Sequence, residues 1–167
     1  MSARFGRLAW VWLSVLVVVL DQATKHYFEA TFNLYQRVEV IPGYFSWTLA
    51  YNTGAAFSFL ADHGGWQRWL FAVIAIGVSV VLVAWLKRLK PNETWLAVAL
   101  ALVLGGAIGN LYDRVVLGHV VDFILVHWQN RWYFPAFNIA DSAITVGAVM
   151  LALDMFRSSK TGEAVND

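Results

Sequence analysis

The sequence contains no cysteine and has few prolines or charged residues. Its 167 residues include 3 Pro, and only 14% are Asp, Glu, Lys or Arg. The lack of cysteine excludes disulfide bonds, thiolate zinc sites and a cysteine nucleophile. Soluble domains carry about a quarter charged residues, so this composition argues against a soluble protein. The net charge of +1 provides no basic surface, and we expect no nucleic-acid partner.

Hydrophobic residues make up 59% of the chain, and the mean hydropathy is +0.57. Both values indicate an integral membrane protein. Four apolar runs are close to the roughly 20 residues that cross a bilayer, and they cover residues 8–25, 69–86, 95–110 and 136–156. We therefore expect an all-α integral membrane protein with four transmembrane helices, folded as a single domain over residues 1–167.

The first apolar run follows two arginines, a pattern that is also found in secretory signal peptides. No small-x-small cleavage site follows Leu20, so we interpret this run as a transmembrane span. Lys and Arg are enriched in cytoplasmic segments beside the spans and therefore indicate orientation. One side would carry Arg4, Arg7, Lys87, Arg88, Lys90, Arg157 and Lys160, and the other Lys25, Arg37, Arg68, Arg114 and Arg131. We expect both termini in the cytoplasm.

This topology leaves two outer segments, residues 27–67 and 111–135, and a flexible tail at 158–167. The first contains "RVEVIPGYFSWTLAYN", which alternates large and small side chains and carries a Pro-Gly turn signal. This pattern predicts a small β-hairpin with one apolar face. The second contains "GHVVDFILVHW", which is too apolar for water and too short to span. We expect that stretch to lie at the membrane interface.

Polar residues in three of the spans lie at one predicted depth. With a rise of about 1.5 Å per residue, Asp21 and Asn110 lie roughly 20 Å from the inner ends of their spans. Asp141 lies roughly 8 Å from the outer end of the fourth span. In a hydrocarbon layer of about 30 Å, all three are in the outer third. Polar groups are costly in a bilayer, so their convergence predicts a shared functional site.

Each polar group also has a structural interpretation. Asp21 and Lys25 are one helical turn apart and could simply pair, so a structural pair and a place in the substrate site both stay open. Gly105 and Gly109 form a small-residue face that is typical of close helix packing. Asn110, Asp113 and Arg114 share one helix face, where a buried amide and guanidinium need partners. For the stripe of Asn138, Asp141 and Thr145, a structural network is the alternative. For Asp113, a helix-end salt bridge and support of the site are both open.

Two outer carboxylates suggest an aspartyl-protease dyad. Asp122 lies in "VVDF" and Asp141 in "NIAD", and the short connection through Pro135 could bring them together. Two carboxylates within a few Å share one proton, so one acts as a base and the other as an acid. The base deprotonates a water that attacks a peptide carbonyl, and a proton goes to the leaving nitrogen. Asp141, at a helix N-terminus, is the better candidate for the ionised member.

Other catalytic arrangements fit the sequence less well. There is no His-Glu-x-x-His zinc motif, and His119, Asp122 and His127 have irregular spacing for a metal site, so we expect no metal. A Ser-Lys dyad would need an outer lysine, for which Lys25 is the candidate. Asp21, one turn earlier, would hold that lysine charged and unfit as a base.

Five ordered motifs cover nearly the whole chain: "DQATK" at 21–25, "NTGAAFS" at 52–58, "GGAIGNLYDR" at 105–114, "VVDF" at 120–123 and "FNIADS" at 137–142. In this order they resemble the bacterial lipoprotein signal peptidases, the signal peptidase II family. The resemblance implies four transmembrane helices, a small periplasmic β-sheet (the cradle) and a periplasmic interfacial helix. It also implies a multi-pass protein of the bacterial inner membrane, with its active site near the periplasmic face.

The implied activity is that of an aspartyl endopeptidase. By resemblance, it removes the signal peptide from diacylglyceryl-modified prolipoproteins, cleaving just before the lipidated cysteine. The matching positions are Asp122 and Asp141 for the catalytic dyad, Asn52, Gly54, Asn110, Arg114 and Asn138 for binding of substrate or the inhibitor globomycin, and Asp21, Lys25 and Asp113 for structural support. The resemblance implies no cofactor, and the expected partners are prolipoprotein substrates and membrane lipids. A self-contained cleft favours a monomer.

Two rival functions remain at the level of sequence. A small proton-coupled transporter or channel could use Asp21, Asp141 and Arg114 as its relay. Such a path needs polar residues at several depths, whereas the inner halves of the predicted spans are almost wholly apolar. A non-enzymatic membrane adaptor would give the outer carboxylates no purpose.

Overall fold

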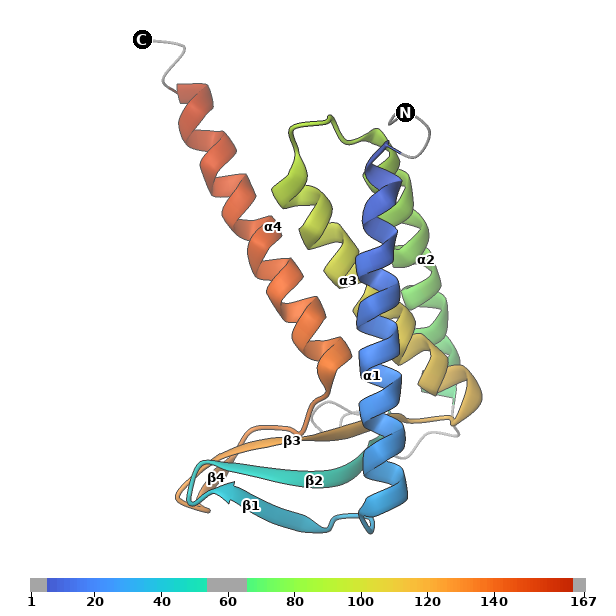
Figure 1. Cartoon of the computed structure of the whole chain (residues 1–167), viewed down its shortest axis with the longest axis vertical. Helices are drawn as coiled ribbons and strands as arrows, with labels where there is room; N and C mark the ends of the chain where they lie inside the picture. Colours follow the sequence, from blue (N-terminus) through green and yellow to red (C-terminus); the bar gives the residue numbers. More distant parts are fainter. Residues whose placement is uncertain (1–5, 54–65, 164–167) are drawn as a thin grey trace.

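The computed structural model describes residues 6–53 and 66–163 (Figure 1). Gly54 and the last residues of the predicted tail lie outside this part of the chain. A short 3-10 helix, η1 (Gly6–Trp10), leads into the first of four long helices, and four strands complete the described elements. The long helices are α1 (Val11–Thr31), α2 (Trp66–Arg88), α3 (Thr94–Val116) and α4 (Ile139–Glu163).

All four helices are long and apolar enough to cross a membrane. The most buried is α3, which packs against α1, α2 and α4. The predicted small-residue face of Gly105 and Gly109, together with the neighbouring Gly106, allows this close approach. A Cβ added at Gly105 would lie 2.8 Å from the carbonyl oxygen of Ser14 in α1, and one at Gly106 would clash with the carbonyl oxygen of Ala140 in α4. Small residues therefore make α3 the centre of the bundle.

An antiparallel sheet with strand order β1-β2-β3-β4 lies across one end of the bundle (Figure 1). The predicted hairpin is present as β1 (Arg37–Ile41) and β2 (Phe45–Asn52). Gly43 has a φ of 82° in the turn between them, a conformation that suits glycine. Trp47 of β2 packs on the Phe28 ring of α1, with ring centroids 5.2 Å apart. Aromatic packing therefore fixes the sheet to the helices.

The apolar stretch that was expected to lie at the interface forms β3 (Val120–Trp128), which pairs with β2 and β4 (Trp132–Tyr133). The first four residues of β3 are buried, and the Phe28 ring of α1 stacks on Phe123 with ring centroids 4.5 Å apart. Phe137, just before α4, exchanges main-chain hydrogen bonds with Ile124. The segment that leads into α4 is thereby held beside β3.

The structure corrects several expectations about the fold class. The label all-α describes only the bundle, because four paired strands form a substantial second part. Within residues 6–53 and 66–163, no separate interfacial helix is found besides η1 and the four long helices. Two helices also run beyond the predicted apolar spans, since α1 continues to Thr31 and α3 to Val116. The predicted tail begins within α4, which extends to Glu163.

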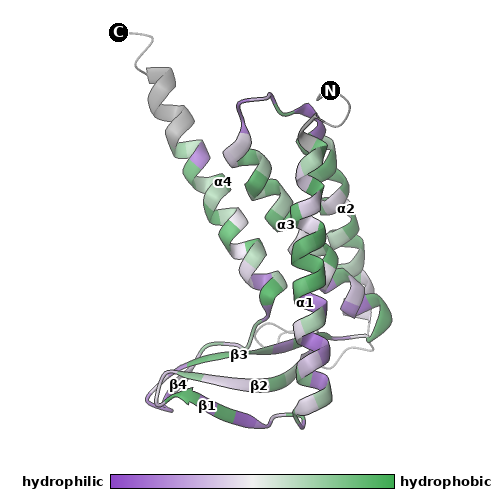
Figure 2. Ribbon diagram, in the orientation of Figure 1, coloured by the Kyte–Doolittle hydropathy of each residue, from purple (hydrophilic) through white to green (hydrophobic). Residues whose placement is uncertain are grey.

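Polar residues lie at defined levels along the bundle. Hydrophilic residues gather where α1, α3 and α4 meet the sheet, and the helices are mostly hydrophobic above that level (Figure 2). The described chain begins and ends at the opposite end of the bundle from the sheet (Figure 1). The sheet and the helix ends that meet it therefore position the candidate site.

Candidate active site

Asp122 lies in β3 and is almost completely buried beneath the helices. Its Oδ1 accepts a hydrogen bond of 2.8 Å from the side-chain amide of Asn138, and Asn52 at the end of β2 also donates to its carboxylate. Burial, with a further contribution from the nearby negative charge of Asp141, raises the pKa of Asp122 to about 7. Near neutral pH this carboxyl group therefore holds a proton for a large fraction of the time.

Asp141 lies in the first turn of α4, where a reciprocal capping arrangement holds it. The main-chain N–H of Asp141 donates to Oδ1 of Asn138 at 2.8 Å, and the main-chain N–H of Asn138 donates back to Oδ2 of Asp141 at 3.3 Å. This capping box begins the helix at Ile139. Two N–H groups are thus satisfied at the helix start, and the carboxylate of Asp141 has a fixed direction.

Asn138 connects the two carboxylates. Its Oδ1 accepts the N–H of Asp141, so its NH2 group faces the other way, toward β3. There it donates to Oδ1 of Asp122 and, at 3.2 Å each, to the carbonyl oxygen of Val121 and to Oδ1 of Asn110. The amide of one fully buried residue therefore holds Asp122 and Asp141 at a common site.

Asn110 of α3 provides a second support for Asp141. Its Oδ1 accepts a hydrogen bond of 3.0 Å from the ammonium group of Lys25. An ammonium group can only donate, so this contact turns the NH2 of Asn110 toward Asp141. The resulting hydrogen bond to Oδ1 of Asp141 measures 2.7 Å. Lys25 in α1 therefore influences Asp141 through the amide of Asn110.

The residues that were predicted to give structural support form a buried ion triad. Nζ of Lys25 lies 2.7 Å from Oδ2 of Asp21 and 2.8 Å from Oδ2 of Asp113. All three side chains are buried. Together with Asn110, the two carboxylates satisfy the three N–H donors of the lysine. Asp113 therefore pairs with Lys25 of a different helix, next to Asn110.

Arg114 lies at the edge of the site, one turn beyond Asn110. Its guanidinium donates to the carbonyl oxygen of Asn110 at 3.2 Å and lies over the ring of Phe71. Arg114, Asn110 and Asp141 line a groove of about 260 Å³ whose other walls are apolar residues of α2, α3 and α4. A second, mainly apolar groove of about 370 Å³ runs between α4 and the segment before it, and Asp141 lines this one too. Asp141 is thus accessible from two apolar grooves.

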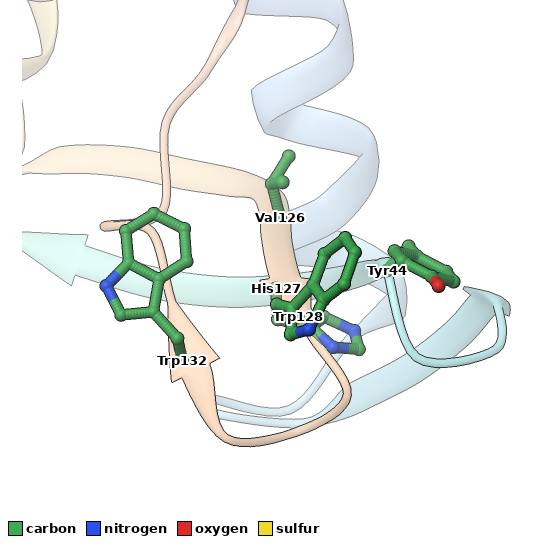
Figure 3. Close-up of a pocket in the computed structure, with 5 residues that line it drawn as sticks. All are labelled: Tyr44, Val126, His127, Trp128 and Trp132. Atoms are coloured by element: carbon green, nitrogen blue, oxygen red, sulfur yellow. The ribbon is translucent and has the colours of Figure 1, made fainter.

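A larger hollow, of about 410 Å³, lies on the sheet away from these groups (Figure 3). It is lined by Tyr44, Val126, His127, Trp128 and Trp132 and contains no carboxylate, so it is not the candidate active site. The imidazole of His127 forms a hydrogen bond with the Ser46 hydroxyl. Among the described residues, no group of three His, Cys, Asp or Glu side chains could hold a metal ion.

The structure brings together nearly all the residues singled out in the sequence. Asp122, Asp141, Asn110 and Asn138 share one hydrogen-bond network, with Asn52 and Arg114 at its edge, whereas Gly54 lies outside the described residues. Sequence reasoning missed Gln22, whose side-chain amide donates to Oδ1 of Asp113 at 2.8 Å and to the carbonyl oxygen of Gly109 at 3.3 Å. A polar residue within an apolar span was the available signal.

Comparisons with known proteins agree over nearly the whole chain. The family described as "Signal peptidase (SPase) II" matches residues 13–157. A protein named "Lipoprotein signal peptidase" from Pseudomonas fluorescens strain Pf-5 is 78% identical over 166 residues, which are 99% of this chain and 98% of that protein. One of the same name from Pseudomonas aeruginosa strain PAO1 is 78% identical over 163 residues, or 98% and 96% of the two chains.

Solved structures extend the similarity to three dimensions. A bacterial membrane enzyme determined by the in meso method at 2.3 Å resolution is 34% identical, with a TM-score of 0.79 over 92% of this chain and 90% of that one. A second such structure, at 1.9 Å resolution, gives a TM-score of 0.77 at the same identity, over 88% and 92%. The residues of the network fall within the matched region, and the chain belongs to the signal peptidase II family.

Proposed function

We propose that this protein is an aspartyl endopeptidase that removes the signal peptide from diacylglyceryl-modified prolipoproteins. The observation that carries the proposal is the bridging of Asp122 and Asp141 by Asn138, in a chain whose relatives are named lipoprotein signal peptidases. In this proposal the scissile bond is the one just before the lipidated cysteine. No cofactor or metal takes part, and the enzyme acts as a monomer.

The chemistry follows from one proton shared by two carboxylates. Burial favours the protonated form of Asp122 near neutral pH. Asp141 accepts hydrogen bonds from Asn110 and from the main chain of Asn138, and a helix N-terminus favours negative charge there. Asp141 then takes a proton from water, and the hydroxide attacks the peptide carbonyl while Asp122 donates to the carbonyl oxygen. Collapse of the tetrahedral intermediate breaks the C–N bond, and a proton passes to the leaving nitrogen.

The surroundings of Asp141 suit a lipid-modified substrate. Both grooves beside it are mainly apolar, so they can accept an apolar signal segment and acyl chains without loss of polar contacts. In our proposal Asn52, Asn110, Arg114 and Asn138 contact the peptide around the scissile bond, together with Gly54. A substrate anchored in the bilayer presents this bond near the membrane surface, where the polar network meets the sheet.

We place the sheet end of the bundle at the periplasmic face of the inner membrane and both termini in the cytoplasm. The distribution of Lys and Arg supports this orientation. The alternative of a proton-coupled transporter is not supported, because the family is one of peptidases. The contacts of Asp21 also argue against a relay, since its carboxylate is held by Lys25 and by the main-chain N–H of Ala140.

Cleavage of a diacylglyceryl-modified prolipoprotein by the purified protein in detergent tests this function. Asn retains the shape of Asp but cannot hold the charge or share the proton. We expect Asp122→Asn and Asp141→Asn each to lower kcat by at least about 10²–10⁴-fold, with globomycin binding retained. The matched control is Asp154→Asn, which removes a carboxylate from the same helix roughly 20 Å from Asp141 and should leave kcat unchanged.

Three results would contradict the proposal in different ways. Near-normal kcat in either dyad variant would exclude that residue from the dyad. A wild-type protein that binds globomycin but does not cleave modified prolipoprotein would refute the substrate class. Equal cleavage of the unmodified prolipoprotein would show that the lipid is not recognised.

A further inference from the structure

Two buried carboxylates outside the dyad accept hydrogen bonds from the main chain directly beside it. Oδ2 of Asp113 in α3 accepts the N–H of Val121 at 3.2 Å. Oδ1 of Asp21 in α1 accepts the N–H of Ala140 at 2.9 Å. Val121 is the residue before Asp122, and Ala140 is the residue before Asp141. Each carboxylate therefore holds the backbone next to one member of the dyad.

The ammonium group of Lys25 joins these two contacts into one unit. It lies within 2.8 Å of an oxygen of each carboxylate, and its third donor reaches Asn110. Gln22 adds a second link, since its side-chain amide donates to Asp113 and, at 3.3 Å, to Asp21. Donors shared by Asp21 and Asp113 thus fix the distance between these two carboxylates. Because each carboxylate holds a main-chain N–H, the distance between Ala140 and Val121 is fixed as well.

Helix packing alone does not account for this arrangement. A single carboxylate would neutralise Lys25, and burying a second charge carries a large desolvation cost. Ala140 is also in the first turn of α4, where N–H groups have no partner within the helix. Asp21 satisfies this donor from a different helix, so α1 holds the N-terminal turn of α4 in place.

The geometry points to Asp21, Lys25 and Asp113 as a positioning clamp that sets the separation of Asp122 and Asp141. This inference rests on the proposed function of those two aspartates as the catalytic pair. The clamp residues touch no reacting atom, and they act through the main chain of Val121 and Ala140. A dyad that shares one proton requires a narrow range of oxygen–oxygen distances, which the clamp would maintain together with the amide of Asn138.

The clamp predicts a specific kinetic effect. Loosening it should misplace the dyad without removing contacts to bound substrate, so kcat should fall while KM stays constant. Misplacement by about 1 Å can cost on the order of 10²-fold in rate. A purely structural contribution would instead lower the fraction of folded protein and leave kcat per folded molecule unchanged.

Three variants separate these cases in the cleavage assay. Asp113→Leu removes the acceptor for Val121, whereas Asp113→Asn retains an oxygen at the same place. Ser14→Ala is the matched control, because the buried Ser14 hydroxyl donates to the carbonyl oxygen of Ala101 across the same α1–α3 interface but far from the dyad. For each variant we would measure kcat, KM, thermal stability and hydrogen exchange of the Val121 and Ala140 amides.

We expect kcat of Asp113→Leu to fall by about 10–100-fold with KM unchanged, together with faster exchange at Val121. Asp113→Asn should retain both kcat, within about threefold, and slow exchange, because its acceptor remains. Ser14→Ala should lower thermal stability and leave kcat and both exchange rates unchanged. The variants Asp21→Leu and Asp21→Asn repeat the test on the other half of the clamp. For these two, hydrogen exchange is measured at the Ala140 amide.

Normal kcat in a folded Asp113→Leu variant would overturn the clamp, as would equal losses of kcat in the Leu and Asn variants. If Asp113→Leu fails to fold, hydrogen exchange in the wild-type protein tests the clamp instead. Rapid exchange of the Val121 or Ala140 amide would show that the backbone is not held there and would overturn the clamp. Failure of the proposed function is distinguishable, because in that case the wild-type protein itself would not cleave the modified prolipoprotein.

Discussion

The two ends of the helix bundle are held together by different interactions. At the end away from the sheet, α2 and α3 pack through an apolar cluster of Leu82, Leu86, Ala97, Leu100 and Leu104. At the sheet end, α1, α3 and α4 meet through buried charged and amide groups, chiefly Asp21, Lys25, Asn110, Asp113 and Asn138. The same bundle therefore uses apolar packing in one half and a polar network in the other.

The difference has a physical basis. In a bilayer, apolar side chains gain little by leaving lipid, so the apolar half depends on shape, which several side chains can provide. A buried polar network has few alternatives, because removal of one member leaves its partners without hydrogen bonds. We therefore expect substitutions at the sheet end to alter geometry and activity, and similar substitutions elsewhere to have small effects on activity.

The largest effect beyond the dyad itself is expected at Asn138. Asn138→Ala removes both the cap of α4 and the bridge to Asp122, so kcat should fall by about 10²-fold or more, with a loss of about 1 kcal/mol in stability from the missing cap. Asn138→Asp separates the two roles, because it retains the cap acceptor but cannot donate to Asp122. It should keep the helix start and still lose activity. Activity near wild type in Asn138→Asp would show that the bridge is dispensable.

The apolar runs and the depth argument explain what could be predicted from the sequence. Asp21, Asn110 and Asp141 were placed at one level because each occupies a helix of known rise, and the structure shows Asn110 bonded to Asp141 and Asp21 bonded to the main chain before it. The hairpin was recognised because its turn residues and alternation are local. Such features depend on near neighbours in the chain.

Other features could not be predicted because they depend on tertiary contacts. Hydropathy indicates which residues can lie in a bilayer, but it does not indicate where a helix ends. The apolar run therefore did not predict that α3 continues through Asp113 and Arg114. The segment 120–128 is mostly apolar on both faces, and its first four residues are buried. Such a pattern does not distinguish a strand from an interfacial segment. The double role of Asn138 arises only where β3 meets α4.

The pH dependence of activity should reflect the shared proton. Asp141 from α4, Lys25 from α1 and Arg114 from α3 are the charged groups around Asp122, whose pKa is about 7. Above this pH the pair loses its proton, so kcat/KM should fall about tenfold per pH unit. Controls at each pH with Asp154→Asn would exclude effects on detergent or substrate. A rate that stays constant up to pH 9 would contradict a proton-sharing role for Asp122.

Stability should change with pH in a related way. The folded protein retains the Asp122 proton between its ordinary pKa of 3.8 and about 7, whereas the unfolded chain releases it. The folded state therefore binds more protons in this window, and its stability should decrease as pH rises through it. This contribution should be absent from Asp122→Asn, so the difference in thermal midpoint between wild type and variant should change between pH 4 and pH 8. A constant difference would show that the proton is not retained.

The smallest effect on activity tests the contrast between the two regions with one substitution made in each. In the network, a Cβ added at Gly109 would lie 2.8 Å from Oδ2 of Asp21, so Gly109→Ala should displace that carboxylate and lower kcat by about tenfold. On the exposed surface of α2, a Cβ at Gly77 meets nothing within 4 Å. Gly77→Ala should leave kcat unchanged and, through better helix propensity, raise stability by about 0.5–1 kcal/mol. Equal effects of the two alanine substitutions on kcat would mean that the polar end tolerates an added methyl group as well as the apolar surface does. The expected difference would show that activity depends on the geometry of the network around Asp21.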